Sequence, residues 1–70
     1  MTMDIHGTIK NAVRDYLGCV SGSIYGDTKG RFQDGDFIRT SKIIKELPNN
    51  IIRTRNSVYR CEWLPEARSR

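Results

Sequence analysis

Residues 37–60 read FIRTSKIIKELPNNIIRTRNSVYR, and this stretch decides the fold that we expect. Within it, a hydrophobic residue followed by Ile-Arg-Thr occurs twice, at residues 37–40 and at residues 51–54. Both segments are rich in β-branched residues, which favour strands, and between them Pro48-Asn49-Asn50 supplies residues typical of turns. The stretch therefore predicts strands at about residues 37–47 and 51–63, the second of them either continuous or broken near Asn56.

Side chains alternate between the two faces of a strand, so each copy of the repeated phrase divides in the same way. Ile38 and Thr40 are expected on one face with Arg39 on the other, and the second copy divides likewise. The register of the pair stays open, since a slip by one residue exchanges the faces. Two interpretations of the repeat follow. It builds two neighbouring strands of one hairpin with shared buried and solvated faces, or it presents a basic strip to a partner.

The basic strip is the binding face that the sequence predicts. Lysine and arginine side chains neutralise phosphates, and exposed aromatic rings among them stack on unpaired bases. Tyr59 is the first candidate for such stacking and Tyr25 is the second, although Tyr59 alternates with Cys61 and Trp63 in a set typical of a buried face. The predicted face comprises Arg39, Lys42, Arg53, Arg55, Tyr59 and Arg60.

The segment before this stretch predicts a helix. Residues 3–17 carry apolar side chains at the i, i+3, i+4, i+7 spacing of one helical stripe, from Ile5 to Leu17. Gly18 is a typical helix stop, and residues 20–25 read as a short strand. We therefore expect an α+β fold, in which an N-terminal amphipathic helix packs on a three- or four-stranded antiparallel sheet. A small curled barrel with the helix across its mouth is the alternative architecture.

The expected core draws on the helix and on the strands. A loop follows residues 20–25, and we expect Phe32 within it to anchor the loop to this core. The core residues that we expect are Ile5, Ile9, Val13, Leu17, Ile38, Ile44, Ile52, Val58 or Tyr59, and Trp63.

Length and charge set the class of protein. The 70 residues predict a single small domain spanning residues 1–70, with a polar tail at 65–70 that we expect to fray. A chain of this size buries only about 60% of its unfolded surface, so a homodimer stays open. The net charge is +4, and eight of the twelve lysines and arginines lie between Lys29 and Arg60, with three acids. This regional excess favours polyanionic or acidic partners.

We expect no cofactor, no metal and no enzymatic activity. Cys19, Cys61 and His6 lack the spacing of a zinc site and do not define a nucleophile and its base. The cysteines are expected to be reduced in a cytoplasmic protein, with a disulfide as the open alternative. Because no apolar run approaches the roughly 20 residues of a membrane span, no membrane partner is expected.

Residues 30–41, GRFQDGDFIRTS, and residues 54–60, TRNSVYR, resemble small uncharacterised proteins encoded by bacteriophages and prophages. The resemblance covers about half of the chain and implies no activity and no site residue. It implies a bacterial cytoplasm as the setting, and a small accessory protein that acts by binding host or phage components.

The sequence therefore predicts a small accessory binding protein that engages a protein partner through the basic sheet face or the hairpin. The first alternative is a nucleic-acid-binding module that uses the arginines of the same strip. The second alternative is a homo-oligomeric structural protein.

Overall fold

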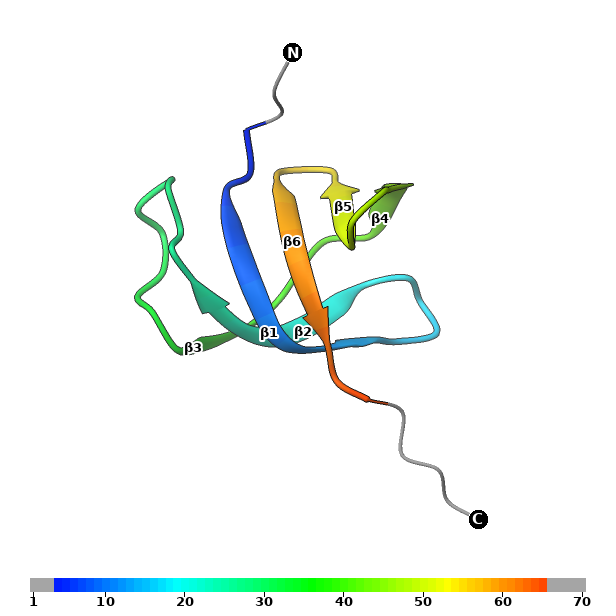
Figure 1. The fold of residues 1–70 in the computed structure, drawn as a ribbon, viewed down its shortest axis with the longest axis horizontal. Helices are drawn as coiled ribbons and strands as arrows, with labels where there is room; N and C mark the ends of the chain where they lie inside the picture. Colours follow the sequence, from blue (N-terminus) through cyan, green and yellow to red (C-terminus); the bar gives the residue numbers. More distant parts are fainter. Residues whose placement is uncertain (1–3, 66–70) are drawn as a thin grey trace.

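The computed structural model describes residues 4–65, which form six β-strands in one sheet (Figure 1). The strands are β1 (Gly7–Arg14), β2 (Val20–Tyr25), β3 (Asp36–Arg39), β4 (Ile43–Leu47), β5 (Ile51–Thr54) and β6 (Val58–Trp63). Within residues 4–65 there is no helix, and hence none with the length and apolar character needed to cross a membrane. The tail expected at residues 65–70 lies, apart from Pro65, outside the described residues.

Two three-stranded antiparallel meanders make up the sheet. One consists of β1, β2 and β3 and the other of β4, β5 and β6, and the order across the sheet is β3-β2-β1-β6-β5-β4. β1 and β6 join the meanders as a parallel pair, with Ile9 opposite Cys61. The sheet is therefore mixed, and its edges are β3 and β4 (Figure 1).

The prediction of a helix at residues 3–17 is wrong, because residues 7–14 form the strand β1. A β-bulge explains the misleading period. Ile9 faces the core, Asn11 adopts a φ of 55°, and the pairing register shifts beside it, so that Ala12 faces the core as well. The bulge thus converts the two-residue spacing of a strand into a three-residue spacing, which imitates one turn of a helix.

The strand expected at residues 37–47 is in fact two strands at opposite edges of the sheet. β3 ends at Arg39, the chain crosses over through residues 40–42, and β4 begins at Ile43. β5 therefore forms its hairpin with β4, whereas β3 pairs with β2. The interpretation of the repeated phrase as two neighbouring strands of one hairpin is wrong. The α+β class and the purely antiparallel sheet are wrong too, since the fold is an all-β mixed sheet.

Other parts of the expected strand pattern match the structure. β2 has the expected bounds, and the segment 51–63 is broken around Asn56 into β5 and β6. Each copy of the repeated phrase buries its Ile and Thr and exposes its Arg, as alternation predicts. The side chain of each threonine accepts a backbone hydrogen bond at the end of its strand. Thr40 Oγ1 accepts a hydrogen bond from the Val20 amide, and Thr54 Oγ1 accepts one from the Ser57 amide.

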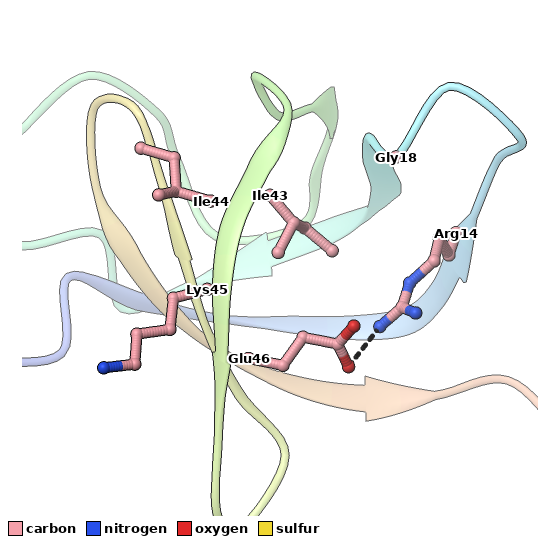
Figure 2. Close-up of a pocket in the computed structure, with 6 residues that line it drawn as sticks. All are labelled: Arg14, Gly18, Ile43, Ile44, Lys45 and Glu46. Atoms are coloured by element: carbon pink, nitrogen blue, oxygen red, sulfur yellow. Dashed lines mark ion pairs between the residues drawn. The ribbon is translucent and has the colours of Figure 1, made fainter.

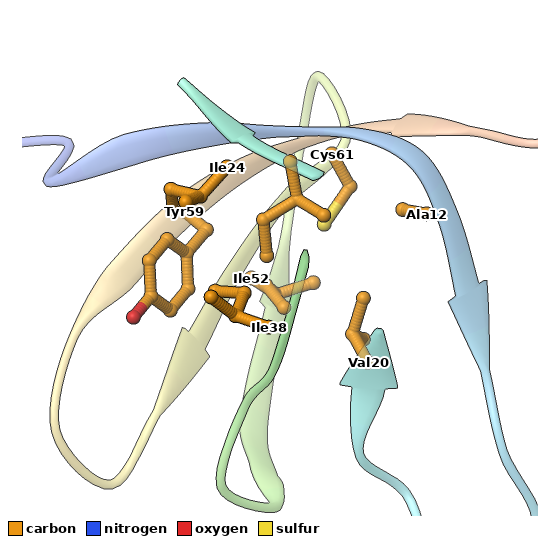
Figure 3. Packing of buried hydrophobic residues seen from close by; sticks show 8 residues of the cluster. Ala12, Val20, Ile24, Ile38, Ile52, Tyr59 and Cys61 are labelled. Atoms are coloured by element: carbon orange, nitrogen blue, oxygen red, sulfur yellow. The ribbon is translucent and has the colours of Figure 1, made fainter. Parts of the chain in front are cut away.

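The core lies on the inner side of the curled sheet, where side chains from both meanders meet (Figure 3). Gly22 permits this packing, because a Cβ atom there would lie 2.5 Å from Ile9 Cγ2. Phe32 packs against the core as expected, and Trp63 does the same. Three expected core residues, Val13, Leu17 and Ile44, are exposed instead. The buried cluster comprises Ile9, Ala12, Val20, Ile24, Ile38, Ile52, Tyr59 and Cys61.

Candidate functional site

Positive charge gathers on the outer side of the sheet, opposite the core. Arg60 of β6 pairs with Ile51 of β5, and Arg53 lies two residues further along the same face of β5. Lys45 of β4 lies opposite Arg53. On β1, Lys10 is two residues beyond Thr8, which is the partner of Arg60. We call the following set the outer basic face: Lys10, Tyr25, Phe37, Lys45, Arg53 and Arg60.

Two exposed aromatic rings border these cations. Phe37 lies on the edge strand β3, is 75% exposed and pairs with Ser23, while Tyr25, two residues along β2, is 37% exposed. Lys10 Nζ lies 4.9 Å from the centroid of the Tyr25 ring, which is a cation–π contact. Glu62 lies opposite Lys10 in the parallel pair and brings a negative charge to this face. The face thus combines ring surfaces with mostly positive charge.

The structure divides the predicted basic strip. Arg53 and Arg60 lie on the outer basic face, and Arg55 lies in the turn between β5 and β6. Arg39 lies two residues from Phe37 on the edge strand β3, but its guanidinium is paired with a carboxylate of the β1–β2 turn. Lys42 belongs to the crossover between β3 and β4. The six predicted residues therefore do not form one continuous surface.

Tyr59 is unavailable for stacking, because it is 4% exposed and lies opposite Ile52 in the core. Its hydroxyl accepts a hydrogen bond of 3.2 Å from Arg31 Nη2. The alternation of Tyr59 with Cys61, which is typical of a buried face, therefore indicated correctly that Tyr59 is buried. Of the two tyrosines considered for stacking, Tyr25 alone lies on the outer basic face.

The loop between β2 and β3 is organised around Asp27, whose side chain is 1% exposed. Its carboxylate accepts hydrogen bonds from the backbone amides of Arg31 and Phe32 and from Arg31 Nη2. Burial raises the pKa of Asp27, but these hydrogen bonds and the charge of Arg31 together lower it by more than burial raises it. The pKa of Asp27 therefore lies below its ordinary value. The ionised carboxylate fixes the loop that carries Lys29 and Phe32.

The turn between β1 and β2 presents two apolar side chains on a fixed backbone. Asp15 Oδ1 accepts hydrogen bonds from the backbone amides of Leu17 at 2.9 Å and Cys19 at 3.0 Å. The bond from Cys19, followed by those from Arg39 and Leu17, lowers the pKa of Asp15. Tyr16 is 95% exposed and Leu17 is 54% exposed. We call these two residues the hairpin tip.

A hollow of about 300 Å³ separates the β1–β2 turn from β4 (Figure 2). Arg14 Nη2 lies 2.7 Å from Glu46 Oε1, and the Arg14 guanidinium stacks over the Trp63 ring at 5.2 Å. The Ile43 amide also donates a hydrogen bond to the Gly18 oxygen, so the edge strand β4 is tied to the first meander. In Figure 2, Ile43 and Glu46 point toward Arg14, which follows from the irregular pairing of β4. The contacts across the hollow join its walls and position β4.

A smaller cavity of about 160 Å³ lies at the turn between β5 and β6. We call it the turn cavity. It adjoins the outer basic face, because Arg53 belongs to both. Its lining residues are His6, Arg53, Thr54, Arg55, Asn56, Ser57 and Val58.

Sequence reasoning missed Lys10, Lys29 and Phe37 as members of a binding surface. The helical interpretation of residues 3–17 assigned Lys10 to the polar side of a helix. The alternation of β-branched and polar residues at Thr8, Ile9 and Lys10 is the signal that favoured a strand. Lys29 carries no such signal, because the folded β2–β3 loop alone brings it to the β5–β6 turn.

The two cysteines are free, with Cys19 partly buried and Cys61 1% exposed. Desolvation raises the pKa of the Cys61 thiol to about 11, although the charge of Arg14 lowers it somewhat. Within the part of the chain that the structure describes, no three side chains of His, Cys, Asp or Glu gather as a metal site. No family model, no curated protein and no solved structure matches the chain.

Proposed function

We propose that the protein binds single-stranded nucleic acid across its outer basic face and acts as an accessory binding protein rather than an enzyme. The observation that carries this proposal is the exposed ring of Phe37, which lies diagonal to Tyr25 and on the same side as Lys10. The exposed Phe37 ring, together with the partly exposed Tyr25 ring, offers an apolar surface that a partner can cover. Unpaired bases present a flat apolar surface that stacks on such rings.

The distribution of charge supports the same partner. Lys10, Arg60 and Arg53 lie on the neighbouring strands β1, β6 and β5, each offset by two residues from the next, so they form a diagonal across the face. A row of cations next to two ring surfaces matches a strand whose phosphates and bases alternate along its length. A duplex hides its base faces, so it would contact the cations but not the rings.

Fluorescence anisotropy with a labelled oligonucleotide of ~12 nucleotides tests this proposal. We expect affinity to fall steeply between low and near-physiological salt, because bound counterions are released on binding. Phe37→Ala is expected to weaken binding by about 1–3 kcal/mol, roughly 5- to 150-fold. Lys10→Gln combined with Arg60→Gln is expected to reduce the salt dependence.

The matched control is Lys42→Gln, which removes one positive charge outside the face and is expected to leave affinity within about twofold at near-physiological salt. Equal loss in Lys42→Gln and in Arg60→Gln would show attraction by net charge alone. Absence of binding at low salt, or equal affinity for a duplex together with no effect of Phe37→Ala, contradicts the proposal.

The hairpin tip favours a protein partner as the second candidate function. Tyr16 is almost fully exposed although its turn is held by the Asp15 carboxylate, so little conformational entropy is lost when the ring enters a pocket. Tyrosines presented in this way are common anchors of protein interfaces. Affinity capture from a bacterial lysate, comparing the native protein with Tyr16→Ala, tests this candidate. Recovery of the same proteins by both variants argues against it.

Self-association is a third candidate, supported by the exposed side chains of Phe37 and Ile44 on the edge strands β3 and β4. Edge strands pair readily with other chains unless charges prevent it. Sedimentation equilibrium of the native protein and of Ile44→Lys measures this directly. A monomer in both cases removes the candidate.

We propose a bacterial cytoplasm as the compartment and a phage or prophage origin. Free cysteines support a reducing compartment. The resemblance of residues 30–41 to phage proteins supports the origin.

A further inference from the structure

Two cationic side chains line the turn cavity and a third lies beside it. Arg53 and Arg55 line it, and Lys29 of the β2–β3 loop donates a hydrogen bond of 2.6 Å from its Nζ to the backbone oxygen of Asn56, which is a lining residue. The ion pairs found within residues 4–65 all involve other arginines. None of the seven lining residues is acidic. Like charges held together without a carboxylate repel one another, so an anion would stabilise the arrangement.

Neutral hydrogen-bond donors accompany these charges. His6 Nδ1 accepts a hydrogen bond of 3.0 Å from the Val58 amide, so the proton of the neutral ring resides on Nε2 and can be donated. Ser57 is 4% exposed and lines the cavity, and its hydroxyl has no hydrogen-bond partner among residues 4–65. Buried hydroxyls in proteins nearly always have a partner, so an unpaired one that lines a cavity can hold a water molecule or an ion there.

We propose that the turn cavity binds a phosphate group. A phosphate carries several acceptor oxygens, which match the guanidinium, ammonium, imidazole and hydroxyl donors gathered here. The size of the cavity supports a small group, since about 160 Å³ corresponds to roughly five molecules of liquid water. Pockets for whole cofactors begin at about 300 Å³.

The source of the phosphate rests on the proposed function. Arg53 contributes to both the turn cavity and the outer basic face, so a strand lying across the sheet toward β5 would reach this cavity with a phosphate. Inorganic phosphate, an internal phosphodiester and a terminal phosphomonoester share the chemistry. A terminal phosphate carries more negative charge than an internal one, so it is the form that we expect to bind best.

Backbone-amide NMR titration with inorganic phosphate, at constant ionic strength set by chloride, tests the cavity itself. We expect saturable shifts confined to residues 53–58, to His6 and to Lys29. Arg55→Gln is expected to weaken phosphate binding about tenfold or more, because it removes a charged donor.

Two serine variants separate binding from folding. Ser57→Ala removes a hydroxyl that has no protein partner, so we expect unchanged thermal stability together with about tenfold weaker phosphate binding. Ser41→Ala is the matched control, since the Ser41 hydroxyl is likewise buried and unpartnered but lies outside the cavity lining. This control is expected to bind phosphate like the native protein.

A second titration compares oligonucleotides of one sequence with and without a 5′-phosphate. If the phosphorylated form binds more tightly and Ser57→Ala removes this difference, the cavity binds a terminal phosphate. If both forms bind equally and Ser57→Ala weakens the binding of both, the cavity binds an internal phosphate. If phosphate binds but oligonucleotides do not, the proposed function is contradicted, while the assignment of the turn cavity as a phosphate site still holds. Phosphate shifts that chloride reproduces, or that survive Arg55→Gln and Ser57→Ala, overturn the assignment of the cavity.

Discussion

Arg39 donates two hydrogen bonds to one carboxylate oxygen of Asp15, from Nε at 3.1 Å and from Nη2 at 2.9 Å. The pair joins the β1–β2 turn to the edge strand β3. Its counterpart in the repeated phrase, Arg53, forms no ion pair within residues 4–65 and lies on the outer basic face. The two copies of Ile-Arg-Thr thus supply one structural arginine and one arginine that can contact a partner.

Replacing the Asp15 carboxylate is expected to loosen the hairpin tip. Asp15→Asn weakens the hydrogen bonds from the Leu17 and Cys19 amides, so amide hydrogen exchange at both positions should accelerate. The folded pKa of Asp15 is lowered, so its stabilisation is present above its ordinary value of 3.8 and is lost as pH falls through the lowered pKa. Thermal melts between neutral and strongly acidic pH should therefore converge for the native protein and the variant. Persistent separation at the lowest pH would contradict this role of the charge.

Gly22→Ala is expected to destabilise the fold by about 1–3 kcal/mol, because the added methyl group overpacks the core. It would lie 2.5 Å from Ile9 Cγ2 and 2.8 Å from the Lys10 backbone oxygen, and a backbone atom cannot move aside as a side-chain end can. Urea denaturation measures the difference. Ser23→Ala on the same strand faces outward and serves as the control, with an expected change within about 0.5 kcal/mol.

Cys61 is expected to resist modification that Cys19 accepts. The Cys61 thiol is buried and its pKa is raised to about 11 by desolvation, whereas Cys19 is partly exposed. A thiol reagent should therefore modify one cysteine in the folded protein and both in urea. Because the folded pKa exceeds the ordinary value of 9.0, the thiol's contribution to stability is present below that value and is lost as pH rises toward about 11. Cys61→Ala should lack this part of the alkaline decline.

In the β4–β5 turn, replacing Asn50 by glycine and replacing it by alanine are expected to have opposite effects on stability. Asn49 and Asn50 have φ values of 66° and 61°, a left-handed conformation that asparagine tolerates and glycine adopts freely. Asn50→Gly should raise or preserve the melting temperature, and Asn50→Ala should lower stability by about 0.5–1 kcal/mol. A lower melting temperature in Asn50→Gly than in Asn50→Ala would show that the Asn50 side chain, rather than the backbone conformation, stabilises the turn.

The strands whose side chains alternate regularly could be predicted from the sequence. β2 follows from residues bounded by glycines, and alternation predicts that Ile38 shares a face with Thr40 and Ile52 with Thr54. The turn at Pro48-Asn49-Asn50 was predictable because asparagine tolerates positive φ. Local chemistry decided each of these features, so no knowledge of distant contacts was needed.

The remaining features depend on contacts between distant residues. The bulge at Asn11 shifts the register of β1 and thereby imitates a helical stripe, and only pairing with β2 and β6 reveals it. The division of residues 37–47 depends on the pairing of β3 with β2 and of β4 with β5, which places the two halves at opposite edges of the sheet. Within the candidate site, Arg53 and Arg60 were predicted together, but their neighbour Lys10 could not be placed until β1 was known to be a strand.

The parallel pairing of β1 with β6 also constrains when the protein can fold during synthesis. β1 is made early, yet one of its two partners is complete only after residue 63. Ribosomes add about 5–20 residues per second, so the first meander waits for seconds with one edge of β1 unpaired. Contacts of such long sequence separation also slow the folding reaction itself. The sheet therefore cannot be completed until β6 has left the ribosome, and until then the unpaired edge of β1 is open to proteases and chaperones.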